Sequence, residues 1–341
     1  MARTEQISVM QLVDRIRTTS DAYAYMEQLR WPNGPVCPHC HETARLYFLN
    51  PANGTSRKTR TGSMSQRRVW KCGACRKQFS VTTGTVFHGS KIDLRKWLFV
   101  IFEMCASKNG VSAREVERKY DLTPKSAWFM TQRIREAMKA GPLAEMMTGV
   151  VIADETYIGG RLPEMNKKRR KALNAQQPMV PGSRTAGPGW NKTSVLSLID
   201  QDTGEVRSRV VPDVTGATLR KAIGEQCDLA TTTLYTDEHK GYKTLAPELA
   251  GHESVNHKDE QYARYRNGEV ITTNAAEGYF SQLKRSLDGT HHHVSVRHLP
   301  RYLAEFDFRY STRKLDDSAR MRRLMGQVGD RRLTYRPLTG R

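Results

Sequence analysis

The pattern of apolar residues divides the chain into a helical first part and a strand-rich second part. Between residues 92 and 140, apolar side chains recur at helical spacing, as in the stripe that contains Leu94, Trp97 and Ile101. From residue 149 onward, short runs of β-branched residues replace this spacing, and the run 150–153 predicts a strand buried on both faces. At 341 residues the chain is long enough for two or three domains.

Three helices are expected within 92–140. An Asn-Gly pair at 109–110 ends the first of them. The residues at 112–115 have the pattern of a capping box, which predicts the start of the second helix. A proline at position 124 is suited to the first turn of a third helix, which we expect to end near residue 139.

Two helices joined by a short turn, the second of them basic, are typical of a helix-turn-helix that binds DNA. We expect DNA contacts from the surface of the third helix, at Lys125, Gln132 and Arg133. A plain helical hairpin has the same pattern. The choice of the DNA-binding interpretation therefore depends on the charge of the chain and on the cysteines that precede these helices.

The second part of the chain predicts a mixed sheet with one helical connection. A polar and basic insertion at 161–192 follows the strand at 150–154. Expected after it are a β-hairpin at 194–211, a helix from 218 to about 226, and a strand ending at Asp237. Strand, hairpin, helix and strand is the element order of a ribonuclease-H-like α/β core.

Four of the six cysteines form two C-x-x-C pairs. Cys37 and Cys40 are followed, after 31 residues, by Cys72 and Cys75. Four thiolates complete a closed tetrahedral site, so we expect one structural Zn²⁺ per chain within a zinc ribbon. A Gly-, Ser- and Thr-rich loop between short aromatic strands accounts for the long spacing. A redox or incidental role of the pairs is the alternative.

The chain is strongly basic, with 55 Lys and Arg against 35 Asp and Glu and a formal charge of +20. This excess indicates a polyanionic partner, although ribosomal or membrane-surface binding would give the same charge. We expect double-stranded DNA to contact the ribbon loop and the insertion. The residues concerned are Arg57, Lys58, Arg60, Arg67, Arg68, Lys167, Lys168, Arg169 and Arg170. A solvated charge run is the alternative for the insertion.

No apolar stretch reaches 18 residues, so no membrane span is expected. The C-terminal residues 313–341 hold nine Lys or Arg against three Asp. A tail that clamps DNA or another subunit and a disordered tail are both compatible with this composition.

Three carboxylates form the candidate catalytic set. Asp154 and Asp237 stand at the ends of two expected strands. If these strands are adjacent in the sheet, the two carboxylates lie close together. Glu277 lies at the start of an expected helix that also carries Lys284. Three carboxylates can hold two Mg²⁺ or Mn²⁺ ions for phosphodiester chemistry, with Lys284 placed for a nearby phosphate. The alternatives are a turn role for Asp154 and a helix-capping role for Glu277. Glu155 is expected outside the metal ligand set.

Three motifs resemble the DDE transposases of bacterial insertion sequences, within them the ISXO-like group. They are DETYIGG, TNAAEGYFSQLKR and GTHHHVSVRHLPRYLAEFDFRYSTRK, and the resemblance covers roughly residues 20–314. It implies a retroviral-integrase-like catalytic domain with Asp154, Asp237 and Glu277 as metal ligands. The family pattern has an aromatic residue where this chain has His291. We expect the histidine run 291–293 to form a turn and to contribute to packing.

The resemblance implies a DNA transposase that binds the terminal inverted repeats of its element, cleaves the ends and transfers the 3′-hydroxyls to target DNA. We expect a homodimer or larger assembly on DNA ends, in the bacterial cytoplasm and associated with the nucleoid. The alternatives are a DNA-binding regulator and a nuclease that cuts without joining. The expected domains are a helical segment 1–34, a zinc ribbon 35–90, a helix-turn-helix 91–145, the catalytic domain 146–312 and the basic tail 313–341.

Overall fold

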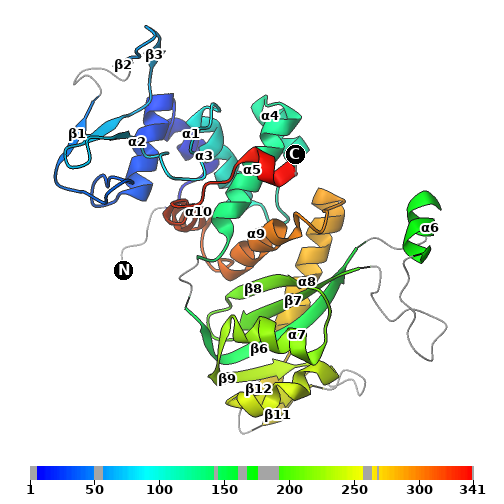
Figure 1. Cartoon of the computed structure of the whole chain (residues 1–341). Coiled ribbons are helices and arrows are strands. Elements are labelled where there is room, and N and C mark those ends of the chain that lie inside the picture. The colour runs from blue at the N-terminus through cyan, green and yellow to red at the C-terminus, as the bar shows by residue number, and fades with distance from the viewer. Residues whose placement is uncertain are drawn as a thin grey trace. The chain divides into compact units, whose positions relative to one another are not determined.

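The computed structural model describes residues 6–49, 57–141, 145–159, 167–175, 192–255, 263–266 and 269–339. The chain forms two compact units (Figure 1). The first contains residues 1–139 together with 312–341, and the second contains residues 140–311.

The first unit begins with two short helices, α1 (Val9–Arg15) and α2 (Thr19–Arg30). Each starts with a complete capping box, because the N-cap hydroxyl and the side chain three residues later satisfy each other's backbone N–H groups. Helix α2 packs against the helical part of the same unit. The expected helical segment is therefore present and belongs to this unit.

The zinc ribbon follows as a small antiparallel sheet of β1 (Leu46–Phe48), β4 (Trp70–Cys72) and β5 (Gln78–Phe79). The expected strands on both sides of the loop are thus present. The loop itself carries a second two-stranded ladder, β2 (Arg57–Lys58) and β3 (Met64–Ser65), and its residues 50–56 lie outside the described residues.

Three helices complete the N-terminal part of this unit: α3 (Leu94–Ala106), α4 (Ala113–Tyr120) and α5 (Pro124–Met138). The Ser112 hydroxyl accepts the Glu115 N–H at the start of α4, and Pro124 opens α5, as the sequence predicts. Asp121 ends α4 in the left-handed conformation, which turns the chain toward α5.

The C-terminal residues fold back onto the same unit. Helix α10 (Asp317–Gly326) packs against α2 and α3 through its buried residues Met321, Leu324 and Met325. A short helix, α11 (Tyr335–Thr339), follows. Of the two alternatives left open for the tail, disorder does not apply to the described residues 313–339.

The second unit contains a five-stranded sheet in the order β10-β9-β6-β7-β8. Strands β6, β9 and β10 run parallel, and β7 and β8 pair antiparallel on the other side of β6. Their bounds are β6 (Met147–Ile158), β7 (Thr193–Asp200), β8 (Val206–Val211), β9 (Cys227–Thr236) and β10 (Gly251–Ser254). This is a mixed α/β sheet with the expected strand, hairpin, helix and strand order.

The two faces of this sheet have separate cores. Side chains at alternate positions of β6 point to opposite faces, so Ile152 joins one core while Val151 and Ala153 join the other. The first core is covered by α8 (Asn274–Ser286) and α9 (Leu299–Ser311), and the second by α7 (Gly216–Gly224) and the 3₁₀ turn Lys240–Thr244.

Four smaller elements are described in the rest of the second unit. They are α6 (Lys167–Ala175) in the insertion, the 3₁₀ turn Ala246–Glu248, the hairpin of β11 (Ala263–Arg266) and β12 (Glu269–Thr272), and a π-helical turn, Leu287–His291. Most of the insertion, 160–166 and 176–191, lies outside the described residues. The His291 ring packs edge-on against Tyr302 with 4.9 Å between centroids, whereas His292 and His293 are exposed.

Strand β6 corrects one expectation. Asp154 was expected at the end of its strand, but β6 continues for four more residues to Ile158. Pairing with β9 stops at Ile152, whereas pairing with β7 continues along the other edge. Asp154 therefore lies within a strand, at the level where its parallel neighbour ends.

Candidate active site

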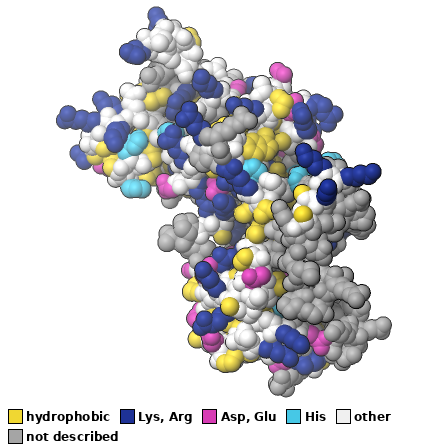
Figure 2. Space-filling model, turned by 45° about the vertical axis from the view of Figure 1, so that its right-hand side comes forward, with side chains coloured by type: hydrophobic (Ala, Val, Ile, Leu, Met, Phe, Trp, Pro, Cys, Tyr) yellow, Lys and Arg dark blue, Asp and Glu magenta, His cyan; other side chains and the backbone are white. Residues whose placement is uncertain are grey.

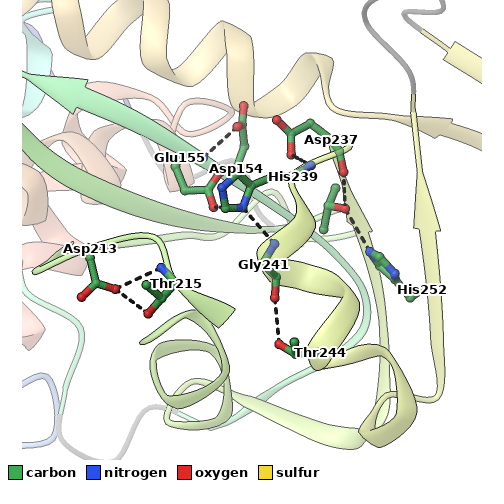
Figure 3. Close-up of polar contacts among 10 residues, drawn as sticks. Asp154, Glu155, Asp213, Thr215, Asp237, His239, Gly241, Thr244 and His252 are labelled. Atoms are coloured by element: carbon green, nitrogen blue, oxygen red, sulfur yellow. Dashed lines mark hydrogen bonds and ion pairs between the residues drawn. The ribbon is translucent and has the colours of Figure 1, made fainter. Parts of the chain in front are cut away.

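Asp154 and Asp237 lie at the same level on neighbouring strands. The last pair of the parallel ladder joins Ile152 to Tyr235, and each aspartate follows two residues later. Because the strands run in one direction, the two carboxylates emerge together at the end of the ladder, where α/β sheets place their ligands. Figure 3 shows both carboxylates directed into the same space.

The Asp237 loop is held by directional hydrogen bonds. The His239 N–H donates to the Asp237 carboxylate at 2.9 Å, and the Thr236 hydroxyl donates to the Asp237 carbonyl at 2.7 Å. The His252 ring nitrogen lies 3.0 Å from the same hydroxyl (Figure 3). These contacts orient Asp237 before any ligand is bound.

Glu155 joins the two aspartates, contrary to the expectation from the sequence. Ligand oxygens of Asp154, Glu155 and Asp237 all lie within 4.8 Å of one another. The Glu155 side chain is 7% exposed, and its buried Oε1 lies 3.9 Å from Nδ1 of His239. The buried Tyr242 hydroxyl is its other polar neighbour. Since its neighbour Asp154 faces the α8 side, Glu155 approaches from the opposite face of β6 (Figure 3).

Burial and mutual repulsion disfavour the charged forms of these groups. The pKa of Asp154 rises to about 7, chiefly through burial and further through the charges of Asp237, Glu155 and Glu277. Burial, together with the charge of Asp237, raises the pKa of Glu155 to about 7 as well. Three carboxylates whose oxygens lie this close together are suited to a hard divalent cation.

Glu277 and Lys284 both project from α8, which packs over β6 and β7. Glu277 is exposed and is not part of the 4.8 Å group, but it is close enough for its charge to raise the pKa of Asp154. A capping role for Glu277 requires Asn274 to be the N-cap residue of α8. The N-cap is Thr273 instead, and Asn274 is the first residue of the helix, so this capping arrangement is shifted by one residue.

The four cysteines of the ribbon converge on one point. The Sγ atoms of Cys37 and Cys75 are 3.7 Å apart, those of Cys40 and Cys72 are 3.6 Å apart, and all four lie within 4.8 Å of one another. A tetrahedral Zn²⁺ with bonds of about 2.3 Å requires sulfur separations of about 3.8 Å. The thiol positions therefore fit a structural zinc ion.

The expected DNA-contacting residues of the ribbon have different surroundings. Lys58, Arg60 and Arg67 are exposed, whereas Arg68 is half-buried and forms an ion pair with Glu27 at 2.8 Å. Lys and Arg side chains recur over the face of the first unit seen in Figure 2. In the insertion Lys167 and Lys168 are exposed. The side chains of Arg57, Arg169 and Arg170 lie outside the described residues.

Helix α5 corrects the expected surface. Gln132 and Arg133 are buried, with 0% and 4% of their surface exposed. Arg133 donates to the His88 carbonyl at 2.7 Å and lies over the ring of Trp97. The expectation that these two side chains face solvent is wrong, because α5 is an interior helix with contacts on both its apolar and its polar side. Lys125 is exposed, with its ammonium 4.4 Å from the ring centroid of Tyr335.

Comparisons with known proteins agree with this arrangement. The model of the ISXO2-like transposase domain matches residues 146–311, and that of the transposase zinc-ribbon domain matches residues 17–78. A protein of Halobacterium salinarum described as an uncharacterized protein in transposable element ISH50 is 28% identical over 289 residues, which are 83% of this chain and 88% of that relative. Among the described residues, no helix has the length and apolarity needed to cross a membrane. Both matches are thus to domains of transposases, a zinc ribbon followed along the chain by the ISXO2-like transposase domain.

Proposed function

We propose that this transposase binds the terminal inverted repeats of its insertion sequence, hydrolyses the phosphodiesters at the ends and transfers the freed 3′-hydroxyls into target DNA. The observation that carries the proposal is the convergence of Asp154 and Asp237 at the end of the parallel ladder, with Glu277 on the covering helix. This convergence supports a ribonuclease-H-like, retroviral-integrase-like catalytic core.

In this proposal Asp154, Asp237 and Glu277 hold two Mg²⁺ or Mn²⁺ ions. Bound divalent ions stabilise the attacking and leaving oxygens of a phosphodiester. The chain supplies the ligands in a fixed place, since the Asp237 loop is held by its own hydrogen bonds and Asp154 lies within a paired strand. Lys284, two turns along α8 from Glu277, is placed to hold a phosphate beside the site.

DNA affinity in the proposal comes from the first unit and from the insertion. The exposed Lys58, Arg60 and Arg67 of the ribbon and Lys167 and Lys168 of the insertion offer positive charge to the phosphate backbone. Helices α4 and α5 form the proposed helix-turn-helix, and the exposed Lys125 lies at the start of α5. Two element ends enter one reaction, so the proposed active form is a homodimer or larger assembly on DNA.

The decisive experiment replaces Glu277 by glutamine. Glutamine keeps the shape of the side chain but is a poor ligand for Mg²⁺, so we expect cleavage of end-containing DNA to fall by several orders of magnitude. The melting temperature and DNA affinity should remain unchanged. Asp288→Asn, which neutralises an exposed carboxylate just beyond the same helix, is the matched control and should retain activity.

The products separate the alternatives. Joined DNA from the wild-type protein supports a transposase, cut ends without joining support a nuclease, and binding without cleavage supports a regulator. A Glu277→Gln variant that cuts and joins at nearly the wild-type rate would show that the proposed ligand set is wrong.

A further inference from the structure

A buried polar network lies on the α8 side of the sheet. Its centre is Asp307 on α9, whose carboxylate accepts the Tyr279 hydroxyl at 2.6 Å, the Ser208 hydroxyl at 2.7 Å and the Ser208 N–H at 2.8 Å. The Ser208 hydroxyl also lies 2.8 Å from that of Ser197. The network thus joins α9, α8, β8 and β7, all within the second unit.

This network lies in the same row of the sheet as the candidate metal ligand Asp154. Asp154 pairs directly with Ser197, and Ser197 pairs directly with Ser208. Directly paired residues of antiparallel strands point to the same face. Asp154, Ser197 and Ser208 therefore lie side by side on one face of the sheet, and Asp307 of α9 binds the last of them. Tyr279 connects Asp307 to α8.

Helix α8 carries Glu277 two residues before Tyr279, so the exposed Glu277 and the buried Tyr279 lie on nearly opposite sides of the same turn. Its apolar contacts, through Ala276, Phe280 and Leu283, hold the helix against the sheet but are not directional. The Tyr279–Asp307 hydrogen bond is directional and ends on a carboxylate that is itself held by the backbone of β8. It specifies one rotation and one axial position of α8.

A buried carboxylate is costly to retain where only packing is needed, because an apolar side chain would fill the same volume without losing hydration. The α9 helix provides a second hydrogen bond to the same segment, since the Tyr310 hydroxyl donates to the Ala275 carbonyl at 3.2 Å. Both bonds act on α8 next to Glu277. Their shared effect is to fix the place of the exposed carboxylate relative to Asp154.

We propose that Asp307 and Tyr279 are positioning residues for the metal site: they hold α8 so that Glu277 meets Asp154 and Asp237 around the divalent ions. This inference rests on the proposed function, because it assumes that Glu277 is a metal ligand. It adds two residues, both outside the ligand set, to the machinery of the reaction.

The test is Tyr279→Phe, which removes one hydroxyl and keeps the ring. Partners that orient metal ligands typically contribute 10- to 100-fold to metal affinity or activity. We expect the half-saturating Mn²⁺ concentration, measured by electron paramagnetic resonance of free Mn²⁺ without DNA, to rise roughly 10-fold. The kcat for end cleavage should fall while the KM for end-containing DNA stays constant.

Ile199→Val is the matched control, because it removes one methyl group from the same core and leaves the network intact. It should lower the melting temperature without changing the Mn²⁺ midpoint. If Tyr279→Phe does not fold, Ser208→Ala carries the same comparison, since it removes one donor to Asp307 and keeps the backbone donor. Its Mn²⁺ midpoint should also rise relative to Ile199→Val.

The outcomes separate this inference from the proposed function. If Glu277→Gln is inactive but Tyr279→Phe binds Mn²⁺ and cleaves as the wild type does, the positioning role is wrong and the ligand set stands. If Glu277→Gln is fully active, the proposed function itself fails. If Tyr279→Phe and Ile199→Val have equal melting temperatures and Tyr279→Phe loses no more Mn²⁺ affinity and cleavage activity than Ile199→Val, the network serves only packing.

Discussion

At the scale of single residues, burial disfavours the charged form of three carboxylates in the second unit. Asp154, Glu155 and Asp307 each have a pKa raised to about 7, with burial as the largest cause. For Asp307 the three hydrogen bonds from Tyr279 and Ser208 oppose this effect but do not cancel it. A carboxylate whose charged form is disfavoured in the folded state makes stability depend on pH.

Asp307→Asn tests this dependence. The folded pKa of Asp307 is about 7 against an ordinary value of 3.8, so the folded state holds the proton more tightly than the unfolded chain. The contribution of this group to stability is fully present below about pH 4 and is lost as pH rises through 7. Asparagine does not titrate. The free energy of unfolding of the wild type, minus that of the Asp307→Asn variant, should therefore decrease from pH 5 to pH 8.

Urea unfolding at four pH values, in metal-free protein, measures this difference. Asp154 and Glu155 titrate in both proteins, so their contributions cancel in the subtraction. A difference that stays constant between pH 5 and pH 8 would mean that Asp307 keeps an ordinary pKa.

The four ribbon cysteines yield a second prediction at this scale. Cys72→Ser removes one of four thiolates, and we expect zinc content to fall from about one ion per chain to nearly none. Cys227→Ser, which replaces a buried thiol of the second unit, should retain the zinc. Metal analysis of both purified proteins checks this, and a zinc content of zero in the wild type would contradict the site.

At the scale of elements, α5 shows how tertiary packing changes the meaning of a basic helix. Its sequence combines an apolar stripe with basic residues at other positions, which indicates one buried and one exposed face. In the structure the basic side also meets protein, as Arg133 lies over Trp97 and Phe129. Tyr335 of α11 covers the start of the helix next to Trp128. The DNA-contacting surface of the proposed helix-turn-helix is therefore smaller than the sequence predicts.

The ribbon loop exposes Lys58 and Arg60, and the proposed DNA contacts of these two residues can be tested. Lys58→Ala and Arg60→Ala should each weaken binding to all DNA sequences alike, because phosphate contacts do not read bases. Each lost contact should reduce the slope of log affinity against log salt by about 0.9.

Fluorescence anisotropy at several salt concentrations, with end-containing and unrelated duplexes, measures this slope. Lys108→Ala removes an exposed charge between α3 and α4 and is the control. An effect confined to end-containing DNA would indicate base recognition by the loop instead.

At the scale of the whole molecule, the chain crosses between its units twice. Residues 312–341 return to the first unit, where the Ile7 N–H donates to the Ser318 hydroxyl at 3.2 Å. The Arg331 guanidinium donates to the Lys139 carbonyl at 2.6 Å. The first unit is therefore built from both ends of the chain, and the second unit is a continuous insertion between them.

This arrangement predicts how fragments behave. A fragment of residues 140–311 has both cores of its sheet and should fold, melt cooperatively and lack specific binding to element ends. A fragment of residues 140–341 adds α10 without its partners α2 and α3 and exposes Met321, Leu324 and Met325. We expect it to aggregate at concentrations at which the shorter fragment stays monodisperse.

Circular dichroism and light scattering compare the two fragments, and anisotropy measures DNA binding. Equal solubility of the two would show that α10 does not depend on the first unit. Retention of end specificity in the fragment 140–311 would contradict the assignment of DNA recognition to the first unit.

Local patterns alone determined much of this protein. The cysteine spacing predicts the thiol cluster, because two C-x-x-C turns bring their sulfurs together wherever the pairs meet. Helix starts at Ser112 and Pro124 were predictable because capping depends on residues within one turn. Asp154 and Asp237 were predictable as neighbours, since each follows an apolar strand run in the order strand, hairpin, helix and strand.

Other features were decided only by tertiary structure. Asp154 lies inside its strand because pairing with β7 outlasts pairing with β9, and pairing partners cannot be seen locally. Glu155 reaches the aspartates from the opposite face, and Asp307 meets Tyr279 across 28 positions of sequence. The burial of Arg133 also depends on helices distant in sequence. Hydrophobic patterning predicts which side chains of one element avoid water, but only packing determines which other elements they meet.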